Sequence, residues 1–448
     1  MNKHILSKST FMYGCQCPLR LFMHKFKPEL RNPEDEAQEA VFAMGTNVGI
    51  VAQGAFPGGI DVSPPDPFSY HLSVAKTQQL IKEGVKIIYE AAFNYDGIMC
   101  AIDVLVNKNN KWYAYEVKGT TSVKEPHIMD ASLQYYVITK SGVALKDFFV
   151  MHLDNTYVKR GDIEIKKLFK AESVLEAVLV NQKFIADKAG EQKEMLRTKK
   201  EPIVEPGDHC FKPYDCDFTE HCRKNIIEEK TDHGKLEIDK AAIKEFIGEF
   251  KYPLFYFDFE TVAHAVPVYD ESRPYQAVPF QYSLHIQRKK ESELEHMHFL
   301  GDGKTDPREA LIKQMLAHVK DKGSILVWYK PFESSKLKNL ARDFPKYEKE
   351  INKIVDRLVD LRDPFKDGHY YHPGFQGSTS IKSVLPVLIP ELSYGDLKIQ
   401  DGMMATTIYA ALKEQSKEVQ EQQRQALLDY CHLDTLAMVR ILEKLKSV

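Results

Sequence analysis

A chain of 448 residues is too long for one ordinary hydrophobic core and fits two domains of about 200 residues each. Its content of 43% hydrophobic and 11% aromatic residues is enough to bury two cores, which excludes a disordered protein. The formal net charge of −3 gives no overall attraction for a polyanion, and this disfavours a pure nucleic-acid-binding module. Contacts to phosphate are therefore expected from local basic segments, such as residues 197–200 and 288–290.

No apolar run reaches the roughly 18 residues of a membrane span, and the first residues lack the apolar segment of a secretory signal. We therefore expect a cytoplasmic protein. Its seven cysteines are then expected to be reduced thiols or metal ligands and not disulfides.

The first 90 residues are expected to be mainly helical. The polar stretch 7–10 supplies an N-cap for a short helix, and residues 19–26 continue with helical apolar spacing. Residues 37–53 are also expected to be mostly helical, with a glycine-rich break at 54–59. A further helix over 66–87 should lead into a sheet.

Residues 101–118 predict a β-hairpin, because two apolar runs flank the Asn-rich stretch 107–110. A four-residue loop would place Asp103 opposite Ala114 and diagonal to Glu116. Since side chains alternate with a period of two, Asp103, Glu116 and Lys118 should share one face.

Charge on this face predicts metal chemistry. Two carboxylates at that separation can share a divalent cation, and an ammonium group beside them can orient water or stabilise a pentavalent phosphate. These are the requirements of metal-assisted phosphodiester hydrolysis. An exposed strand face with an ordinary ion pair is the alternative.

Asp103 and the Glu-Val-Lys sequence at 116–118 resemble the core of the PD-(D/E)XK nucleases. In the RecB-like branch an acidic residue precedes the hairpin and a Gln-Tyr helix follows it, as Glu90 and Gln134 do here. The histidine that many RecB-like nucleases carry on an early helix has no counterpart in residues 45–53.

This resemblance implies a Mg²⁺ or Mn²⁺ site. Asp103 and Glu116 would be ligands, with Glu90 in place of the missing histidine. Lys118 and Gln134 would be catalytic.

After the hairpin, residues 148–153 predict a strand and residues 164–195 a long, charged amphipathic stretch. Three cysteines then follow at equal spacing: Cys210, Cys216 and Cys222. Thiolates crowded in this way indicate a soft metal, which needs a fourth ligand from elsewhere.

Cys17, followed by a proline, is the expected fourth ligand, and Cys15 is the alternative. One cysteine before the nuclease segment and three after it resemble the iron–sulfur nucleases of CRISPR adaptation and of the AddB type. This implies a [4Fe–4S] cluster held by four cysteines: Cys17, Cys210, Cys216 and Cys222.

Zinc is the alternative metal, with His209 or His221 as further ligands, although a C-x2-C knuckle is absent. Buried thiols without a ligand are the remaining interpretation. Cys100 and Cys431 lie in apolar segments and are expected in the cores.

A charged segment follows, and we place a domain boundary near Lys230, which gives domains 1–229 and 230–448. The apolar run 254–261 then predicts a strand buried on both faces, with Asp258 and Glu260 on the same face. Adjacent buried carboxylates are costly unless they bind a cation. A strand end exposed to water is the alternative.

Asp-x-Glu-Thr at the start of a domain resembles the DnaQ-like 3′→5′ exonucleases of the ribonuclease H-like superfamily. Residues 324–329 predict the next strand of that fold, and Glu333 opens a helix where the family has an aspartate. Lys330 stands where it has an asparagine.

A C-terminal helix carries Tyr430 and Asp434 one turn apart, as in the tyrosine-bearing (DEDDy) subgroup. The resemblance implies metal ligands Asp258, Glu260, Glu333 and Asp434, with Tyr430 orienting the attacking water. Asp360 and Lys382 are either supporting groups or structural residues.

The expected fold class is α/β, with a restriction-endonuclease-like mixed sheet flanked by helices followed by a ribonuclease H-like domain. The two halves together resemble an uncharacterised bacterial two-domain family. The expected function is a nuclease with two Mg²⁺ or Mn²⁺ sites acting on nucleic acid, with single-stranded DNA favoured. The alternative is a nucleic-acid-binding scaffold with inactive sites, and redox chemistry is disfavoured because no Gly-rich phosphate loop follows a strand.

Overall fold

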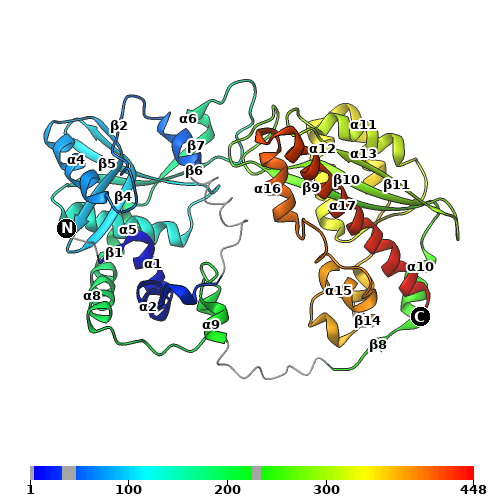
Figure 1. Cartoon of the computed structure of the whole chain (residues 1–448). Coiled ribbons are helices and arrows are strands. Elements are labelled where there is room, and N and C mark those ends of the chain that lie inside the picture. The colour runs from blue at the N-terminus through cyan, green and yellow to red at the C-terminus, as the bar shows by residue number, and fades with distance from the viewer. Residues whose placement is uncertain (1–4, 33–46, 224–233) are drawn as a thin grey trace. The chain divides into compact units, whose positions relative to one another are not determined.

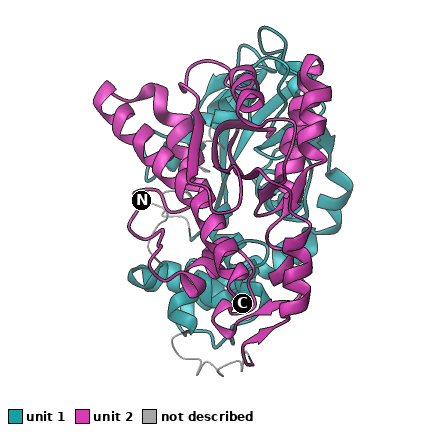
Figure 2. Cartoon of the chain, turned by 90° about the vertical axis from the view of Figure 1, so that its right-hand side faces the viewer, with its two compact units in different colours: residues 1–229, 265–274 teal, residues 230–264, 275–448 magenta. Residues whose placement is uncertain are grey.

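The computed structural model describes residues 5–32, 47–223 and 234–448 (Figure 1). The chain forms two compact units, residues 1–229 with 265–274 and residues 230–264 with 275–448 (Figure 2). The loop 265–274 thus belongs to the first unit, although the sequence assigned it to the second domain. Both units combine mixed β-sheets with flanking helices, which confirms the α/β class.

The first unit is built on a seven-stranded sheet in the order β2-β3-β4-β5-β6-β7, with β1 beside β4. The strands β3 to β5 are antiparallel, whereas β5 and β6 are parallel and are connected through α5. The strands are β1 Leu6–Ser7, β2 Ile60–Asp61, β3 Ile87–Tyr95, β4 Ile98–Lys108, β5 Lys111–Lys118, β6 Leu145–Leu153 and β7 Phe169–Ser173.

The helices of this unit include the two predicted at its start. Ser7 caps α1, since its hydroxyl accepts from the N–H of Thr10 and its own N–H donates to the Thr10 hydroxyl. Residues 47–53 are helical as predicted, and residues 37–46 lie outside the described ranges. The α-helices with full bounds are α1 Lys8–Gln16, α2 Pro18–Phe26, α4 Tyr70–Lys82, α5 Glu125–Lys140, α6 Ile165–Leu168, α7 Leu175–Val180, α8 Gln182–Thr198 and α9 Thr219–Arg223, with short 3₁₀ turns at Pro28–Leu30 and Asp208–Cys210.

Two expectations for this unit were wrong. The stretch 164–195 is interrupted by the edge strand β7, which is mostly exposed and therefore lacks apolar alternation. The hairpin loop is two residues, Asn109 and Asn110, both with φ above +50°. Such residues form the tight turns that match strand twist. The register is therefore shifted by two, and Asp103 lies beside Glu116 instead of Ala114.

The second unit contains a five-stranded sheet in the order β11-β10-β9-β12-β13. The strands β9, β10 and β11 are antiparallel, and β12 and β13 run parallel to β9. The strands are β9 Leu254–Ala263, β10 Ala277–Gln287, β11 Leu294–Leu300, β12 Ile325–Val327 and β13 Leu358–Asp360, and a separate pair is β8 Glu237–Ile238 with β14 Tyr370–Tyr371.

The two faces of this sheet differ in polarity. Phe255, Phe257 and Phe259 of β9 point into an apolar core shared with α11, α12 and α13. The opposite face carries polar residues and is covered by α17, drawn in red in Figure 1. The helices are α10 Lys240–Gly248, α11 Arg308–His318, α12 Lys330–Asp343, α13 Glu348–Val355, α14 Asp363–Lys366, α15 Ile381–Leu388, α16 Gly402–Ala411 and α17 Lys417–Lys446, with 3₁₀ turns at Pro345–Tyr347, Pro373–Phe375 and Leu412–Glu414.

The strand β9 is buried on both faces, as predicted. Within the described ranges, no helix combines the length and apolar content needed to cross a bilayer.

Candidate metal and cluster sites

In the first unit, the sheet brings Glu90, Asp103 and Glu116 side by side on three adjacent strands. The β3–β4 register aligns Glu90 with Asp103 at a point where the ladder is interrupted, and Glu90 has a positive φ of 54°. The backbone N–H of Val117 donates to Asp103 at 2.5 Å. A non-glycine residue with positive φ is uncommon and recurs at functional sites.

Glu116 is the centre of this group and is only 2% exposed. Its Oε2 accepts from Gln134 of α5 at 2.6 Å, and its Oε1 lies 3.1 Å from the ammonium of Lys118. Gln134 also donates to the carbonyl of Ala101. The structure thus brings together the first-unit site residues predicted from the sequence.

Two further residues of this site were missed. Lys8 of α1 places its ammonium 2.5 Å from Glu116 Oε1, although 108 residues separate them. Asp130 of α5 pairs with Lys118. Asp130 lies one helical turn before Gln134, so the helical period could have identified it. Nothing local in the sequence indicates Lys8.

These contacts set the charges of the site. Burial opposes ionisation of Glu116, but Lys8 and Lys118 outweigh it and lower its pKa to about 2. Burial, with Glu116 and Asp61 nearby, raises the pKa of Glu90 to about 7. The pKa of Asp103 is raised well above its usual value by burial and by Glu116. The lysines therefore hold Glu116 in its ionised form, whereas burial favours the neutral forms of Glu90 and Asp103 when no cation is bound.

In the second unit, four carboxylates converge from three distant segments. Asp258 and Glu260 lie on the face of β9 beneath α17, Glu333 lies in the first turn of α12, and Asp434 lies on α17. Each of Glu260, Glu333 and Asp434 is less than 9% exposed. The four predicted ligands are thus close enough to repel one another electrostatically.

Burial and mutual repulsion both shift the pKa values of these carboxylates. Burial, followed by neighbouring carboxylates, raises the pKa values of Asp258, Glu260 and Glu333 well above their usual range. Burial raises the pKa of Asp434 to about 7, against the opposing hydrogen bond from Tyr394. Among the described residues, no lysine or arginine forms an ion pair with any of the four. One oxygen of Glu333 is buried without a hydrogen-bond partner.

Two tyrosines and a lysine adjoin these carboxylates. Tyr394, which the sequence did not single out, donates to Asp434 at 2.6 Å. Its ring centroid lies 6.0 Å from that of Tyr430, and the Lys382 ammonium lies 5.6 Å from both centroids. Lys382 also donates to the carbonyl of Gln400. A phenol and an ammonium group are thus positioned beside the acidic cluster.

Asp360 fits the structural alternative considered for it, and Cys431 is buried as expected but adjoins the acidic cluster. Asp360 accepts from the N–H groups of Lys330 and Arg362, so its role is to fix the start of α12. Cys431 is buried as expected, but its sulfur lies 4.0 Å from Asp258. Ligand atoms of Asp258, Glu260 and Cys431 lie within 4.8 Å of one another.

Four cysteines of the first unit line one small pocket: Cys17, Cys210, Cys216 and Cys222. All are free thiols. His209 lines the same pocket, whereas Cys15 contacts Gln192 instead. Within the described residues, no three of these four sulfurs all lie within 4.8 Å of one another.

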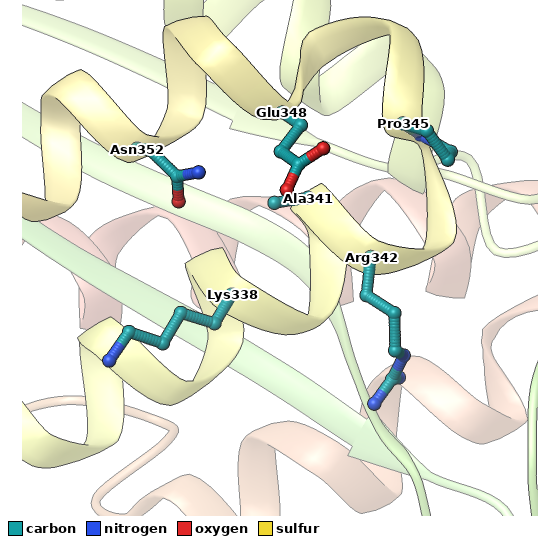
Figure 3. Close-up of a pocket in the computed structure, with 6 residues that line it drawn as sticks. All are labelled: Lys338, Ala341, Arg342, Pro345, Glu348 and Asn352. Atoms are coloured by element: carbon teal, nitrogen blue, oxygen red, sulfur yellow. The ribbon is translucent and has the colours of Figure 1, made fainter.

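Another pocket, of about 400 Å³, lies between α12 and α13 (Figure 3). Its lining residues are Lys338, Ala341, Arg342, Pro345, Glu348 and Asn352. None of the four clustered carboxylates lines it, so this pocket is not part of the acidic site.

Residues 255–380 match the family model of a domain of unknown function, DUF2779. The chain is 29% identical over 206 residues to an uncharacterized protein, the MG366 homolog, of Mycoplasma pneumoniae, and 27% identical over 206 residues to the uncharacterized protein MG366 of Mycoplasma genitalium. Each match covers 42% of this chain and 31% of the relative. An uncharacterized protein of Ureaplasma parvum, UU173, is 28% identical over 202 residues, which cover 39% of this chain and 28% of that protein. The chain therefore spans about a third of the length of these curated relatives.

Proposed function

We propose that this protein is a metal-dependent nuclease that hydrolyses phosphodiester bonds of single-stranded DNA and carries one active site in each unit. The observation that carries the proposal is the second-unit cluster of Asp258, Glu260, Glu333 and Asp434. Four clustered carboxylates, three of them buried and none in an ion pair with a lysine or arginine of the described residues, are unfavourable in isolation. Oxygen ligands in this number are what hard divalent cations require.

The residues of the second unit fit a pair of Mg²⁺ or Mn²⁺ ions. The four carboxylates would hold the ions, which when bound activate water and stabilise the leaving oxygen in phosphoryl transfer. Tyr430 would orient the attacking water through its phenol, and Tyr394 holds Asp434 in place. Lys382 would bind a phosphate group of the DNA strand.

The topology of the second unit supports a DnaQ-like, ribonuclease H-like fold. When the strands are numbered by their order in the chain, from β9 as 1 to β13 as 5, they lie across the sheet in the order 3-2-1-4-5. Strands 1, 2 and 3 are antiparallel, and strands 4 and 5 run parallel to strand 1. This order places β9, which carries Asp258, at the centre of the sheet. Removal of nucleotides from 3′ ends is the activity proposed for this unit.

The topology of the first unit supports a RecB-like PD-(D/E)XK fold. An antiparallel β3-β4-β5 meander is followed by α5 and by β6 parallel to β5. Glu90, Asp103 and Glu116 would hold a cation, while Lys118 assists the water. Gln134 fixes the carboxylate of Glu116.

We favour a [4Fe–4S] cluster over zinc at the cysteine pocket, because Cys210, Cys216 and Cys222 are each six residues apart and lack the C-x2-C pair of structural zinc sites. A cluster here would tie Cys17 at the start of α2 to the segment 210–222.

A scaffold with an inactive first unit is the second candidate, and one observation favours it. Lys8 and Lys118 both lie against Glu116, so a cation must compete with an ammonium already in the site. Nucleic-acid binding without cleavage in this unit would leave the second unit as the only nuclease.

The proposal is tested by incubating anaerobically purified protein with end-labelled single-stranded DNA and Mn²⁺, alongside Lys118→Ala and Asp258→Ala variants. We expect each variant to lose one of two product patterns. Loss of activity only with Asp258→Ala would support the inactive first unit. No cleavage of DNA or RNA by the unmodified protein would refute the nuclease.

A further inference from the structure

Three histidines meet on the polar face of the second-unit sheet, outside the carboxylate cluster. His285 lies on β10, His296 on β11 and His432 on α17, and one ligand nitrogen of each lies within 4.8 Å of the others. Their ring centroids are 4.4, 4.5 and 4.7 Å apart. The rings are inclined to one another by 36°, 63° and 82°. They therefore form a triangle of imidazoles and not a parallel stack.

Two hydroxyl groups lie within hydrogen-bond distance of one nitrogen of His285 and one nitrogen of His296. Nδ1 of His285 lies 2.8 Å from the hydroxyl of Thr435, and Nε2 of His296 lies 2.9 Å from that of Ser283. The two hydroxyls are themselves 2.7 Å apart. If each of these imidazole nitrogens donates to its hydroxyl, the lone pairs of Nε2 of His285 and Nδ1 of His296 are left to bind a metal ion. Metal-bound histidines are oriented by hydrogen bonds of this kind.

We propose that His285, His296 and His432 form a binding site for a divalent transition-metal ion of the zinc type, which ties α17 to the sheet. Three imidazoles from three elements match the protein ligands of zinc sites that keep one open coordination position. His296 and His432 are partly exposed, so that position faces solvent or a further ligand. Imidazole nitrogen favours zinc, nickel or copper, whereas carboxylate oxygen favours magnesium or manganese.

The test measures zinc binding by the full-length protein without an affinity tag. The protein is purified so that the cofactor proposed at the four-cysteine pocket stays bound. Protein is dialysed against Zn²⁺ with excess Mg²⁺, and bound zinc is measured by mass spectrometry for the wild type, His296→Gln, His432→Gln and the control His71→Gln. His71 is exposed and lies in the first unit. We expect the wild type and His71→Gln to hold one zinc more than either cluster variant. Equal zinc in all four proteins would overturn the site.

A second measurement needs no substitution. Diethyl pyrocarbonate modifies free imidazoles, and peptide mapping reports each histidine. We expect Zn²⁺ to slow the modification of His296 and His432 at least tenfold while leaving His71 unchanged. Equal rates with and without Zn²⁺ would show that the cluster only packs α17. The result is independent of nuclease activity, because neither assay uses DNA.

Discussion

Charge compensation at single residues distinguishes the two acidic sites. Glu116 in the first unit is flanked by Lys8 and Lys118, which hold it ionised. Asp258 in the second unit lies beside other carboxylates and the thiol of Cys431, and no lysine or arginine of the described residues forms an ion pair with it. A bound cation should therefore stabilise the second site more than the first, where two ammonium groups already compete for Glu116.

Neutralising Asp258 should stabilise the metal-free protein. The carboxylates of this cluster have raised pKa values, so the folded state holds protons that the unfolded state loses above about pH 4. The contribution of these protonated carboxyl groups to stability is fully present below about pH 4. It is lost as the pH rises through their pKa values in the folded protein, and that of Asp434 is about 7. Asp258→Asn should thus raise the free energy of unfolding by about 1–3 kcal/mol in EDTA at pH 8 and have little effect at pH 5.

Chemical denaturation at both pH values checks this expectation, with Asp429→Asn as the control. Asp429 is exposed on the same helix as Asp434. Destabilisation by Asp258→Asn at pH 8 in EDTA would contradict mutual repulsion. Added Mn²⁺ should stabilise the wild type but not the variant.

Removing the ammonium of Lys8 should tighten cation binding in the first unit. Lys8→Met deletes the group that competes for Glu116, and we expect at least a tenfold lower Kd for Mn²⁺, or about 1.4 kcal/mol. Calorimetry in an Asp258→Asn background isolates this site, and Lys183→Met on the exposed face of α8 is the control. An unchanged Kd would show that Lys8 does not occupy the cation position.

At the scale of elements, the alternation of side chains along a strand was predicted correctly, whereas the pairing register between the hairpin strands was not. The face shared by Asp103, Glu116 and Lys118 was predicted although the loop length was wrong, because a shift of two residues keeps every side chain on its face. The strand β9 was predicted from its apolar run. Lys8 and Tyr394 could not be found in this way, since each reaches its partner through tertiary packing across 108 and 40 residues. Strand β7 was missed because it is polar and at the sheet edge.

The turn of the β4–β5 hairpin offers a test of this register. Asn109 and Asn110 both have positive φ, which glycine adopts without a steric cost. Asn110→Gly should raise the free energy of unfolding by about 0.5–1 kcal/mol, and Asn110→Val should lower it by about 1–2 kcal/mol. Denaturation of the two variants measures the difference. Equal stability of both variants would contradict a two-residue turn.

At the scale of the whole molecule, each unit has its own core and its own acidic site. The thiol pocket belongs to the first unit alone and joins residues far apart in its sequence. Loss of a cofactor there should therefore affect the first unit and leave the second intact.

Cys216→Ser should remove the proposed iron–sulfur cluster. We expect the purified variant to lose its visible iron–sulfur absorption and its bound iron, and the thermal transition of the first unit to fall. Cys15→Ser is the matched control, because Cys15 lies outside the pocket. Equal iron content in the two variants would contradict the assignment of the four ligands.

The central claim is that the carboxylates of the second unit hold the ions for phosphodiester hydrolysis. The most direct measurement is the single-turnover rate of 3′-nucleotide removal from 5′-labelled single-stranded DNA at saturating Mn²⁺, in a Lys118→Ala background that lacks the proposed first-unit activity, for the otherwise unmodified protein, Asp434→Asn and Asp429→Asn. The two variants remove the same charge from one helix, but only Asp434 belongs to the cluster. We predict a fall of at least 100-fold for Asp434→Asn, about 2.7 kcal/mol, and an unchanged rate for Asp429→Asn. Equal rates for the two variants would contradict the claim.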